Sequence, residues 1–357
     1  MKNLSTITCA IILFLATSCG SKQGTEEEKI FHFDTSNAEV IDLDQIKGTP
    51  LEADYEGKPY SIVGDVNDIT LVGDKILIYT NDFSPNGTNL LVYNNKGQFL
   101  NPIGFRGRAD NEYSWVKDYW FEGDNVCVLD FNSRKIVKYS LDGKHIETIS
   151  IREKEGVFSS LISFGEGFIA KCTYIGSNGD YAPSPAIAYY DKDYNFVSNI
   201  GNHSIRSGVD MGNTISTYGK DAFYKHPLDR KIYKINSNLD SKHTYTLDFG
   251  EMNMPDLSTF KDEYEVVNKM RDETWRNNHV AVCFNFSFTE NIFSFTYGVG
   301  LDFYIGSCNP KSGKTRSVKF KSERHIIIAK SFGEDIVVLT EGDENAILYI
   351  LQGAAKI

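Results

Sequence analysis

Short apolar runs separated by polar turns extend along most of the chain. Typical runs cover residues 76–79, 90–93, 126–129, 136–139 and 336–339. Short runs rich in Val, Ile, Leu and Tyr, bounded by Gly, Asn, Asp or Ser, are typical of β-strands. Helical periodicity is almost absent from these segments. The pattern therefore predicts an all-β protein.

A unit made of a strand ending in Tyr, a tight polar turn and a second strand recurs along the chain. Its turns are 46, 51 and 46 residues apart, at positions Gly97, Gly143, Tyr194 and Asp240. A fifth unit fits residues 308–315, and residues 325–339 begin a sixth. This period is the length of a four-stranded propeller blade. The prediction is a six-bladed β-propeller of four-stranded antiparallel blades over residues 31–357; a β-sandwich with similar turns is the alternative.

A strand-like segment at residues 39–43 lies near the start of this predicted propeller. We expect it to complete the last blade and so to join the two ends of the chain. Closure of this kind removes the exposed sheet edges that invite aggregation.

One segment, residues 255–277, departs from the β pattern. Its apolar residues follow the three- and four-residue spacing of an amphipathic helix, at Leu257, Phe260, Tyr264, Val267 and Met270. The inserted helix is expected to pack on the propeller itself; a lid over the channel or a docking site for a partner is the alternative. Aromatic residues alternate along the segment 284–297 that follows. They are expected mainly to fill the core, and they could also stack on sugar rings.

The N-terminus has the layout of a bacterial secretory signal. Lys2 precedes an apolar run over residues 7–16, and the small residues Ala16 and Ser18 precede Cys19. This order is similar to the lipobox of bacterial lipoproteins. We expect residues 1–18 to be the signal peptide, Cys19 to carry the lipid, and residues 19–30 to form a flexible tether. Plain secretion, with Cys19 an ordinary cysteine, is the alternative.

Composition and charge limit the partners. The chain has 357 residues, 41% of them hydrophobic, and a formal net charge of -11, which becomes -12 once Lys2 leaves with the signal. This charge disfavours nucleic acid and anionic lipid surfaces. The remaining cysteines have no metal-ligand spacing and are expected to be buried free thiols, at Cys127, Cys172, Cys283 and Cys308; a disulfide between two of them is the alternative. No cofactor is predicted.

Four segments carry a family resemblance, at residues 33–43, 50–52, 91–99 and 103–113. With them, almost all of the mature chain resembles the six-bladed TolB-like or NHL-like propeller lipoproteins of Gram-negative bacteria. The most specific piece in that family tends to read Gly-Arg-Gly-Pro-Gly-Glu-Tyr; residues 107–113 keep the Gly, Arg, Glu and Tyr but lack the Pro and second Gly. The resemblance implies a binding or scaffolding role in the cell envelope, at the outer membrane.

The loop after the first repeat supplies the candidate ligand-binding residues, which are Arg106, Arg108, Glu112 and Tyr113. These side chains, with Asp110, could converge on a ligand at the channel mouth. The alternative is structural, because Arg and carboxylate groups can pair with each other and with backbone carbonyls to lock one blade to the next. Asp130 is expected to form a turn.

No catalytic or nucleotide-binding motif occurs in the chain. Four histidines are candidates for the channel face, namely His203, His226, His243 and His279. The predicted function is a lipid-anchored envelope module that binds a partner protein, a glycan or another ligand at the channel mouth. The alternative is an envelope hydrolase, lactonase-like or glycan-cleaving, with a metal in the channel. A purely structural envelope protein is a third class.

Overall fold

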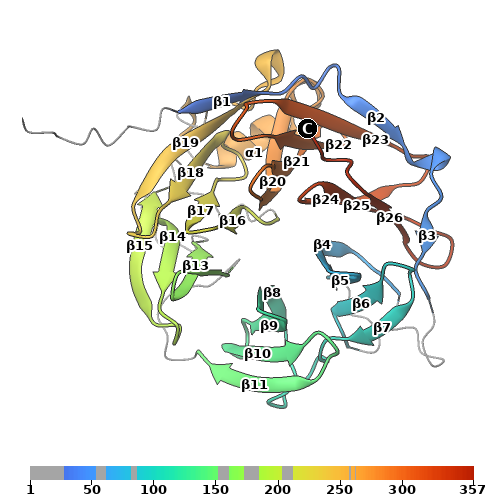
Figure 1. Cartoon of the computed structure of the whole chain (residues 1–357), viewed down its shortest axis with the longest axis vertical. Coiled ribbons are helices and arrows are strands. Elements are labelled where there is room, and N and C mark those ends of the chain that lie inside the picture. The colour runs from blue at the N-terminus through green and yellow to red at the C-terminus, as the bar shows by residue number, and fades with distance from the viewer. Residues whose placement is uncertain are drawn as a thin grey trace, which may run out of the picture.

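Six small antiparallel sheets stand around a central channel and form a β-propeller (Figure 1). The computed structural model describes residues 28–53, 62–81, 87–151, 161–172, 185–202, 212–256, 259–261 and 263–357. The predicted all-β, six-bladed fold is confirmed. Every blade starts with its innermost strand at the channel and ends with its outermost strand at the rim.

The first three blades follow the chain without interruption. Blade 1 contains β4 (Val66–Val72), β5 (Lys75–Thr80), β6 (Leu90–Asn94) and β7 (Phe99–Pro102). Blade 2 contains β8 (Val116–Glu122), β9 (Asn125–Asp130), β10 (Lys135–Ser140) and β11 (His145–Ser150). Blade 3 contains β12 (Ile162–Phe164), β13 (Gly167–Lys171), β14 (Pro185–Tyr190) and β15 (Phe196–Asn202).

The last three blades recruit strands from the N-terminus. Blade 4 contains β16 (Ile215–Tyr218), β17 (Asp221–Tyr224), β18 (Lys231–Ile235) and β19 (Ser241–Asp248). Blade 5 contains β20 (Val280–Phe288), β21 (Phe293–Val299), β22 (Asp302–Cys308) and β23 (Thr315–Lys321). Blade 6 contains β24 (Ile326–Phe332), β25 (Asp335–Thr340), β26 (Ile347–Leu351) and β3 (Thr49–Pro50).

Residues 29–50, which we call the N-terminal belt, run along the rim across these three blades (Figure 1, blue). β1 (Lys29–His32) pairs in parallel with β19, and β2 (Glu39–Asp42) pairs in parallel with β23. After the short 3-10 helix η1 (Leu43–Gln45), β3 pairs antiparallel with β26. The prediction that residues 39–43 complete the last blade is therefore wrong. β2 adds a fifth strand to blade 5, and the two residues of β3 close the ring.

The recurring polar turn joins the two outermost strands of a blade. In blades 1, 3, 4 and 5 a side-chain oxygen at the first turn position accepts two backbone N–H groups, at Asn94, Asp191, Asn236 and Asn309. Gly97 and Gly143 have positive φ angles of 79° and 81°. A Cβ on Gly143 would lie 2.5 Å from the carbonyl oxygen of Pro102 in the preceding blade. Glycine is therefore required at position 143 for two reasons: the positive φ angle and the lack of space for a Cβ.

The core consists of apolar side chains packed between neighbouring blades. Between blades 4 and 5 it is aromatic: the rings of Phe286, Phe293 and Phe295 are buried and stack with centroids 5.3 to 5.7 Å apart. The expected core role of the 284–297 aromatics is thus confirmed for these residues. The belt contributes Phe31 and Phe33 to the same cluster.

The inserted helical segment lies between β19 and β20, and it holds several short helices where one helix was predicted over residues 255–277. It contains η3 (Gly250–Met252), α1 (Glu263–Arg271) and α2 (Glu273–Arg276). Val266 is fully buried and packs against Leu228 and Val282 of blades 4 and 5, so the helix packs on the propeller as expected. The predicted apolar stripe is wrong at Tyr264, which is 70% exposed.

Residues 1–27 lie outside the described part of the chain, and with them the signal peptide and Cys19. The signal and the lipidation therefore stay predictions. β1 begins at Lys29, and the hydroxyl of Thr246 in β19 donates to the Glu28 carboxylate (2.6 Å). Among the described helices, none has the length and apolar character needed to cross a membrane.

The four cysteines of the described residues are free thiols; Cys127, Cys283 and Cys308 are buried as predicted, whereas Cys172 is half-buried. Burial raises the pKa of Cys283 to about 11 and that of Cys172 to about 12. Because the thiolate is the reactive form, these groups are poor nucleophiles at neutral pH.

Replacing Phe33 by Ala tests the contribution of the belt. Phe33 is 4% exposed, and its ring lies 5.1 Å from Phe295 and 5.6 Å from Phe249. We expect the free energy of unfolding to fall by about 3 kcal/mol, measured by urea denaturation. Ile30→Ala is the control in the same belt, since Ile30 is 52% exposed and should change stability by less than about 0.5 kcal/mol. Equal effects of the two variants would contradict the role of the belt as part of the core.

Candidate functional site

The central channel holds the candidate site. Because every blade repeats the same strand order, the innermost strands all begin at one end of the channel, which we call the channel mouth. A cavity of about 620 Å³ lies in the channel. All six innermost strands contribute to its wall, with polar lining residues that include Asn67, Asp68, Lys117, Asp118, Asn213, Ser216, Ser287 and Lys330.

A β-bulge recurs at the second residue of four innermost strands. The ladder skips Asn67 in β4, Lys117 in β8, Ala281 in β20 and Ile327 in β24. A bulge leaves one residue outside the ladder and re-aims its side chain, and bulges are common beside functional sites. The bulged residues of blades 1 and 2 are polar and line the cavity, whereas those of blades 5 and 6 are apolar. The channel mouth therefore has a polar side, formed by blades 1 and 2.

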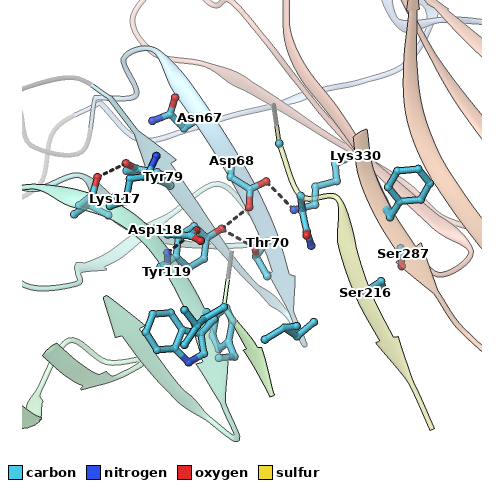
Figure 2. A pocket seen from close by; sticks show the side chains of 18 of the residues that line it. Asn67, Asp68, Thr70, Tyr79, Lys117, Asp118, Tyr119, Ser216, Ser287 and Lys330 are labelled. Carbon is cyan, nitrogen blue, oxygen red and sulfur yellow. Dashed lines mark hydrogen bonds and ion pairs between the residues drawn. The ribbon is translucent and has the colours of Figure 1, made fainter. Parts of the chain in front are cut away.

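A charged network runs along the channel wall through the neighbouring blades 6, 1 and 2 (Figure 2). The Lys330 ammonium donates to one carboxylate oxygen of Asp68 (2.7 Å), and the Tyr119 hydroxyl lies 3.1 Å from the other. The hydroxyl of Thr70 lies 2.7 Å from that of Tyr119. The Lys330 side chain is only 8% exposed and that of Asp68 23%. The pair thus joins the last blade to the first inside the channel.

Two tyrosines of this wall are held as neutral hydroxyl groups. Burial, reinforced by the negative charge of Asp68, raises the pKa of Tyr119 well above its usual range. Burial also raises the pKa of Tyr79, whose hydroxyl donates to the carbonyl of Val116 (2.6 Å). This bond from Tyr79 links blade 1 to Val116, the first residue of β8.

The polar side of the channel mouth combines amides with an aromatic ring. The side-chain amides of Asn67 and Asn81 bond to each other reciprocally, with N–O distances of 2.5 and 2.7 Å. Trp115 directly precedes β8, lines the cavity and is 42% exposed. Lys117 and Asp118 line the same wall. These groups offer donors, acceptors and one flat apolar face.

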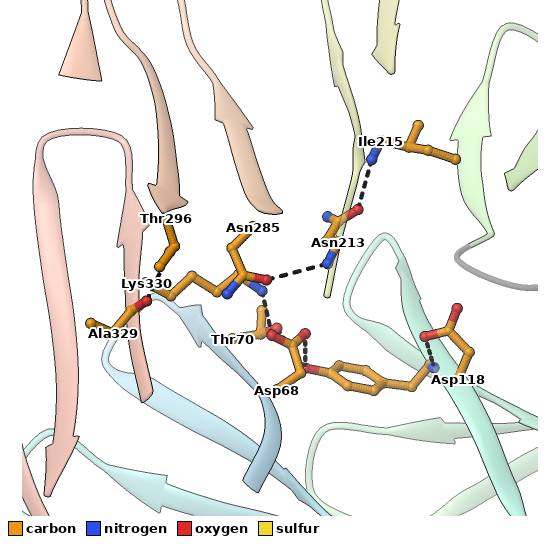
Figure 3. A network of polar contacts seen from close by, with 10 residues as sticks. Asp68, Thr70, Asp118, Asn213, Ile215, Asn285, Thr296, Ala329 and Lys330 are labelled. Atoms are coloured by element: carbon orange, nitrogen blue, oxygen red, sulfur yellow. Dashed lines mark hydrogen bonds and ion pairs between the residues drawn. The ribbon is translucent and has the colours of Figure 1, made fainter. Parts of the chain in front are cut away.

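The opposite side is organised by two asparagines (Figure 3). Asn285 has a φ of 55°, and its side-chain oxygen accepts the backbone N–H of Asn213 (3.2 Å). The side-chain oxygen of Asn213 accepts the N–H of Ile215 (3.0 Å), and its backbone carbonyl accepts that of Phe286 (3.0 Å). These bonds join blades 4 and 5, so the two amide oxygens here position backbone.

Lys225 is a buried lysine with a structural role. Its ammonium donates to the carbonyls of His226 (2.6 Å), Pro227 (3.3 Å) and Cys283 (3.3 Å) and lies 5.5 Å from the centre of the Phe286 ring. Burial lowers its pKa to about 8. Because all three acceptors are backbone carbonyls, Lys225 ties the turn after β17 to β20.

The four residues predicted to bind ligand lie in the loop from β7 to β8, and none of them lines the cavity. Tyr113 is fully buried, and its hydroxyl donates to the carbonyl of Ile103 (3.2 Å). Glu112 accepts the N–H of Ala109 (2.9 Å) within the loop. Arg106 forms a β-bridge with Tyr113. Arg108 is exposed at the surface of this loop.

Blade 2 holds the same loop in place. The Lys135 ammonium donates to the carbonyl of Ala109 (2.8 Å), and the Tyr139 hydroxyl donates to that of Asn111 (2.8 Å). These contacts agree with the structural alternative for the loop. A ligand-binding role for the four residues stays a prediction.

Asp130, expected to form a turn, does so and also fixes the start of the neighbouring strand. One carboxylate oxygen accepts the N–H of Ser133 (3.2 Å) and the hydroxyl of Ser114 (2.8 Å), and the other accepts the N–H of Ser114 (2.7 Å). Burial by itself would raise the pKa of Asp130, but the bonds from Ser114 and Ser133 hold it below its usual value.

The described residues contain no group of three or more His, Cys, Asp or Glu side chains that could hold a metal ion. The candidate histidines His226, His243 and His279 do not line the cavity, and His203 lies outside the described residues. The described channel wall thus offers amides, hydroxyls, aromatic side chains, of which Trp115 is exposed, and two acidic and two basic groups.

A family model described as a domain of unknown function, DUF4934, matches residues 44–354. The chain belongs to this family. No curated protein matches it in sequence.

Two solved structures share the fold of this DUF4934 protein. One is a protein from Bacteroides fragilis whose provisional name describes it as exported. Its TM-score is 0.66 at 15% sequence identity, and the match covers 91% of this chain and 99% of that one. The other is a DUF4221 family member from Bacteroides vulgatus, with a TM-score of 0.54 at 10% identity, covering 85% of this chain and 95% of that one. At these identities the likeness extends to the fold alone.

Replacing Asp68 by Ala tests the ion pair that joins blades 6 and 1 in the channel wall. The change leaves the Lys330 ammonium buried without its carboxylate, so we expect the free energy of unfolding to fall by about 3 kcal/mol in urea denaturation. The double variant Asp68→Leu with Lys330→Met should recover most of that loss. Glu290→Ala is the control, because Glu290 and its partner Lys311 are 67% and 66% exposed and such pairs contribute less than about 1 kcal/mol. Equal losses in the two single variants would show that the channel pair is not special.

Proposed function

We propose that this protein is an exported, lipid-anchored propeller of the cell envelope that binds a ligand at the mouth of its central channel. One observation carries the proposal. The β-bulges of blades 1 and 2 leave the polar residues Asn67 and Lys117 outside the strand pairing, and both line the same side of the channel mouth. The exposed indole of Trp115 lines the cavity next to them. Concave sites with a few convergent polar groups and an aromatic surface are typical of small-ligand binding.

Binding is favoured over hydrolysis by the state of the charged groups. The Asp68 carboxylate is held by Lys330 and Tyr119, so it is already committed to the wall. A hydrolase needs an activated nucleophile or a metal-bound water near an acid or base. Among the residues that the structure describes, none gives Asp68 either arrangement, whereas a binding site needs only donors and acceptors that stay in place.

The envelope location is supported by the sequence before the belt. A signal-like segment at residues 1–18 precedes Cys19, and the similarity to propeller lipoproteins points the same way. The Bacteroides fragilis protein of the same fold is provisionally named as exported. We place the anchored protein at the outer membrane.

Lipidation at Cys19 predicts a clear biochemical difference. Cells given labelled palmitate should incorporate it into the wild-type protein and retain that protein in the membrane fraction. Cys19→Ala should abolish the label and release the protein from membranes, because the acyl chains supply the anchoring energy. Cys172→Ala is the control and should keep label and location. Label that persists in Cys19→Ala would rule out this anchor.

Ligand binding is tested with the full-length protein and an envelope extract. Native mass spectrometry should detect a bound component in the wild type. Ser287→Trp places a bulky ring in the cavity wall and should remove at least about nine-tenths of that binding, since it fills the space the ligand needs. Ser237→Trp is the control, because Ser237 is exposed in the rim turn between β18 and β19. Binding that is absent from the wild type, or unchanged in Ser287→Trp, would contradict the proposal.

A further inference from the structure

We propose that the ligand is a neutral saccharide, with one sugar ring stacked on Trp115 and its hydroxyl groups bound by Asn67, Asn81 and Asp118. The inference rests on the proposed function and names the class of ligand that the same cavity takes. It comes from four features of the channel mouth: an exposed indole on fixed backbone, a pair of amides, the balance of charge, and the size of the cavity.

The backbone that carries the Trp115 indole is held by hydrogen bonds of the two neighbouring residues, Ser114 and Val116. The backbone N–H and the hydroxyl of Ser114 bond to the Asp130 carboxylate (2.7 and 2.8 Å). The carbonyl of Val116 accepts the Tyr79 hydroxyl (2.6 Å), and Val116 pairs with Asp130 in the ladder. The backbone on both sides of Trp115 is therefore fixed, while the residue itself is 42% exposed. Fixing the backbone reduces the ordering that ligand binding requires.

An exposed aromatic face suits the apolar side of a sugar ring. The face of an indole carries negative charge density and attracts the polarised C–H groups that a pyranose presents on one side. Peptides and nucleobases can stack on an indole as well. The neighbouring polar groups therefore decide between these ligands.

The amide pair matches hydroxyl groups. Each side-chain amide has two N–H donors and an oxygen with two lone pairs, and the reciprocal bonds between Asn67 and Asn81 use one of each. The second N–H of Asn67 is directed at the Tyr79 hydroxyl, so Asn67 keeps an acceptor, while Asn81 keeps a donor and an acceptor for a ligand. A sugar hydroxyl both donates and accepts, so it can satisfy such a pair. Asp118, on the adjacent strand β8, adds a carboxylate acceptor at the same wall.

The charge of the cavity wall favours a neutral ligand. The charged lining residues are two acids and two bases, Asp68, Asp118, Lys117 and Lys330. Lys330 is bonded to Asp68 at 2.7 Å. The formal charge of the wall is therefore zero, which gives no net attraction for a phosphate, a carboxylate or a cation. The cavity of about 620 Å³ is within the range typical of small-ligand sites.

The test uses the full-length lipoprotein in a zwitterionic detergent, because glycoside detergents would compete. Glucose, galactose, mannose, xylose and N-acetylglucosamine, with their di- and tetrasaccharides, are titrated by calorimetry and tryptophan fluorescence. Galacturonate and a tetra-alanine peptide are the anionic and peptide probes. We expect at least one neutral saccharide to bind and to change the fluorescence, and the two other probes not to bind.

Three variants locate the site. Trp115→Ala should weaken saccharide binding by more than about tenfold, and Asp118→Asn by about tenfold, the effect of one charge-assisted hydrogen bond. Phe105→Ala is the matched control: Phe105 is a 45% exposed aromatic in the loop before β8 that does not line the cavity. It should bind like the wild type. Unchanged melting temperatures of all three exclude a folding effect.

Other outcomes overturn the inference and identify what failed. Saccharide binding that is unchanged in Trp115→Ala would place the sugar elsewhere. Binding of galacturonate or the peptide in preference to every neutral sugar would replace the ligand class. If no sugar binds while the envelope extract still yields a component lost in Ser287→Trp, the saccharide inference fails and the proposed function stands. If neither experiment detects a ligand, both fail.

Discussion

The pairing of β3 with β26 is the constraint on which the ring depends. Only two residue pairs make this contact, Thr49 with Leu348 and Pro50 with Ile347, yet they join segments about 300 positions apart. The chain reinforces them on both sides of the seam. The Leu51 N–H donates to the carbonyl of Ala346 (3.0 Å) in blade 6, and the Glu52 N–H donates to that of Gly97 (2.9 Å) in blade 1. Before it reaches the seam, the belt is also fixed on blades 4 and 5, so closure is shared among three blades.

The same seam organises the channel. Asp68 belongs to the first blade and Lys330 to the last, so their ion pair exists only when the ring is closed. Tyr119 extends the contact into blade 2 through the second carboxylate oxygen. Buried charged pairs contribute more to a defined arrangement than to net stability. Closure of the ring therefore sets the positions of the channel-mouth walls. The arrangement of the site on blades 1 and 2 depends on the same closure.

Much of the fold could be predicted because each blade repeats a local signal. The short polar residue that starts the outer turn, such as Asn94 or Asn236, acts on backbone within four positions and is visible in the sequence. Closure could not be predicted in the same way. Residues 39–43 look like a strand and lie on blade 5, whereas Thr49–Pro50 is too short to show a pattern and closes the ring.

The site was less predictable than the fold. Asp68 and Lys330 are 262 positions apart, and only the closed ring brings them together. A charged residue in an otherwise apolar strand, such as Lys330 after residues 326–329, was the one signal available. The Arg106 to Tyr113 loop attracted the prediction by its charge, while Trp115, two residues beyond it, lines the cavity.

The bulges separate the residues that hold the propeller together from the residues that line its channel. A bulged residue is outside the ladder, so its identity is not set by a partner on the next strand. Positions 67, 117, 281 and 327 hold Asn, Lys, Ala and Ile on four equivalent strands, which shows that one backbone feature accepts very different side chains. Evolution can therefore rewrite what the channel recognises at these positions while the pairing that holds the ring together stays unchanged.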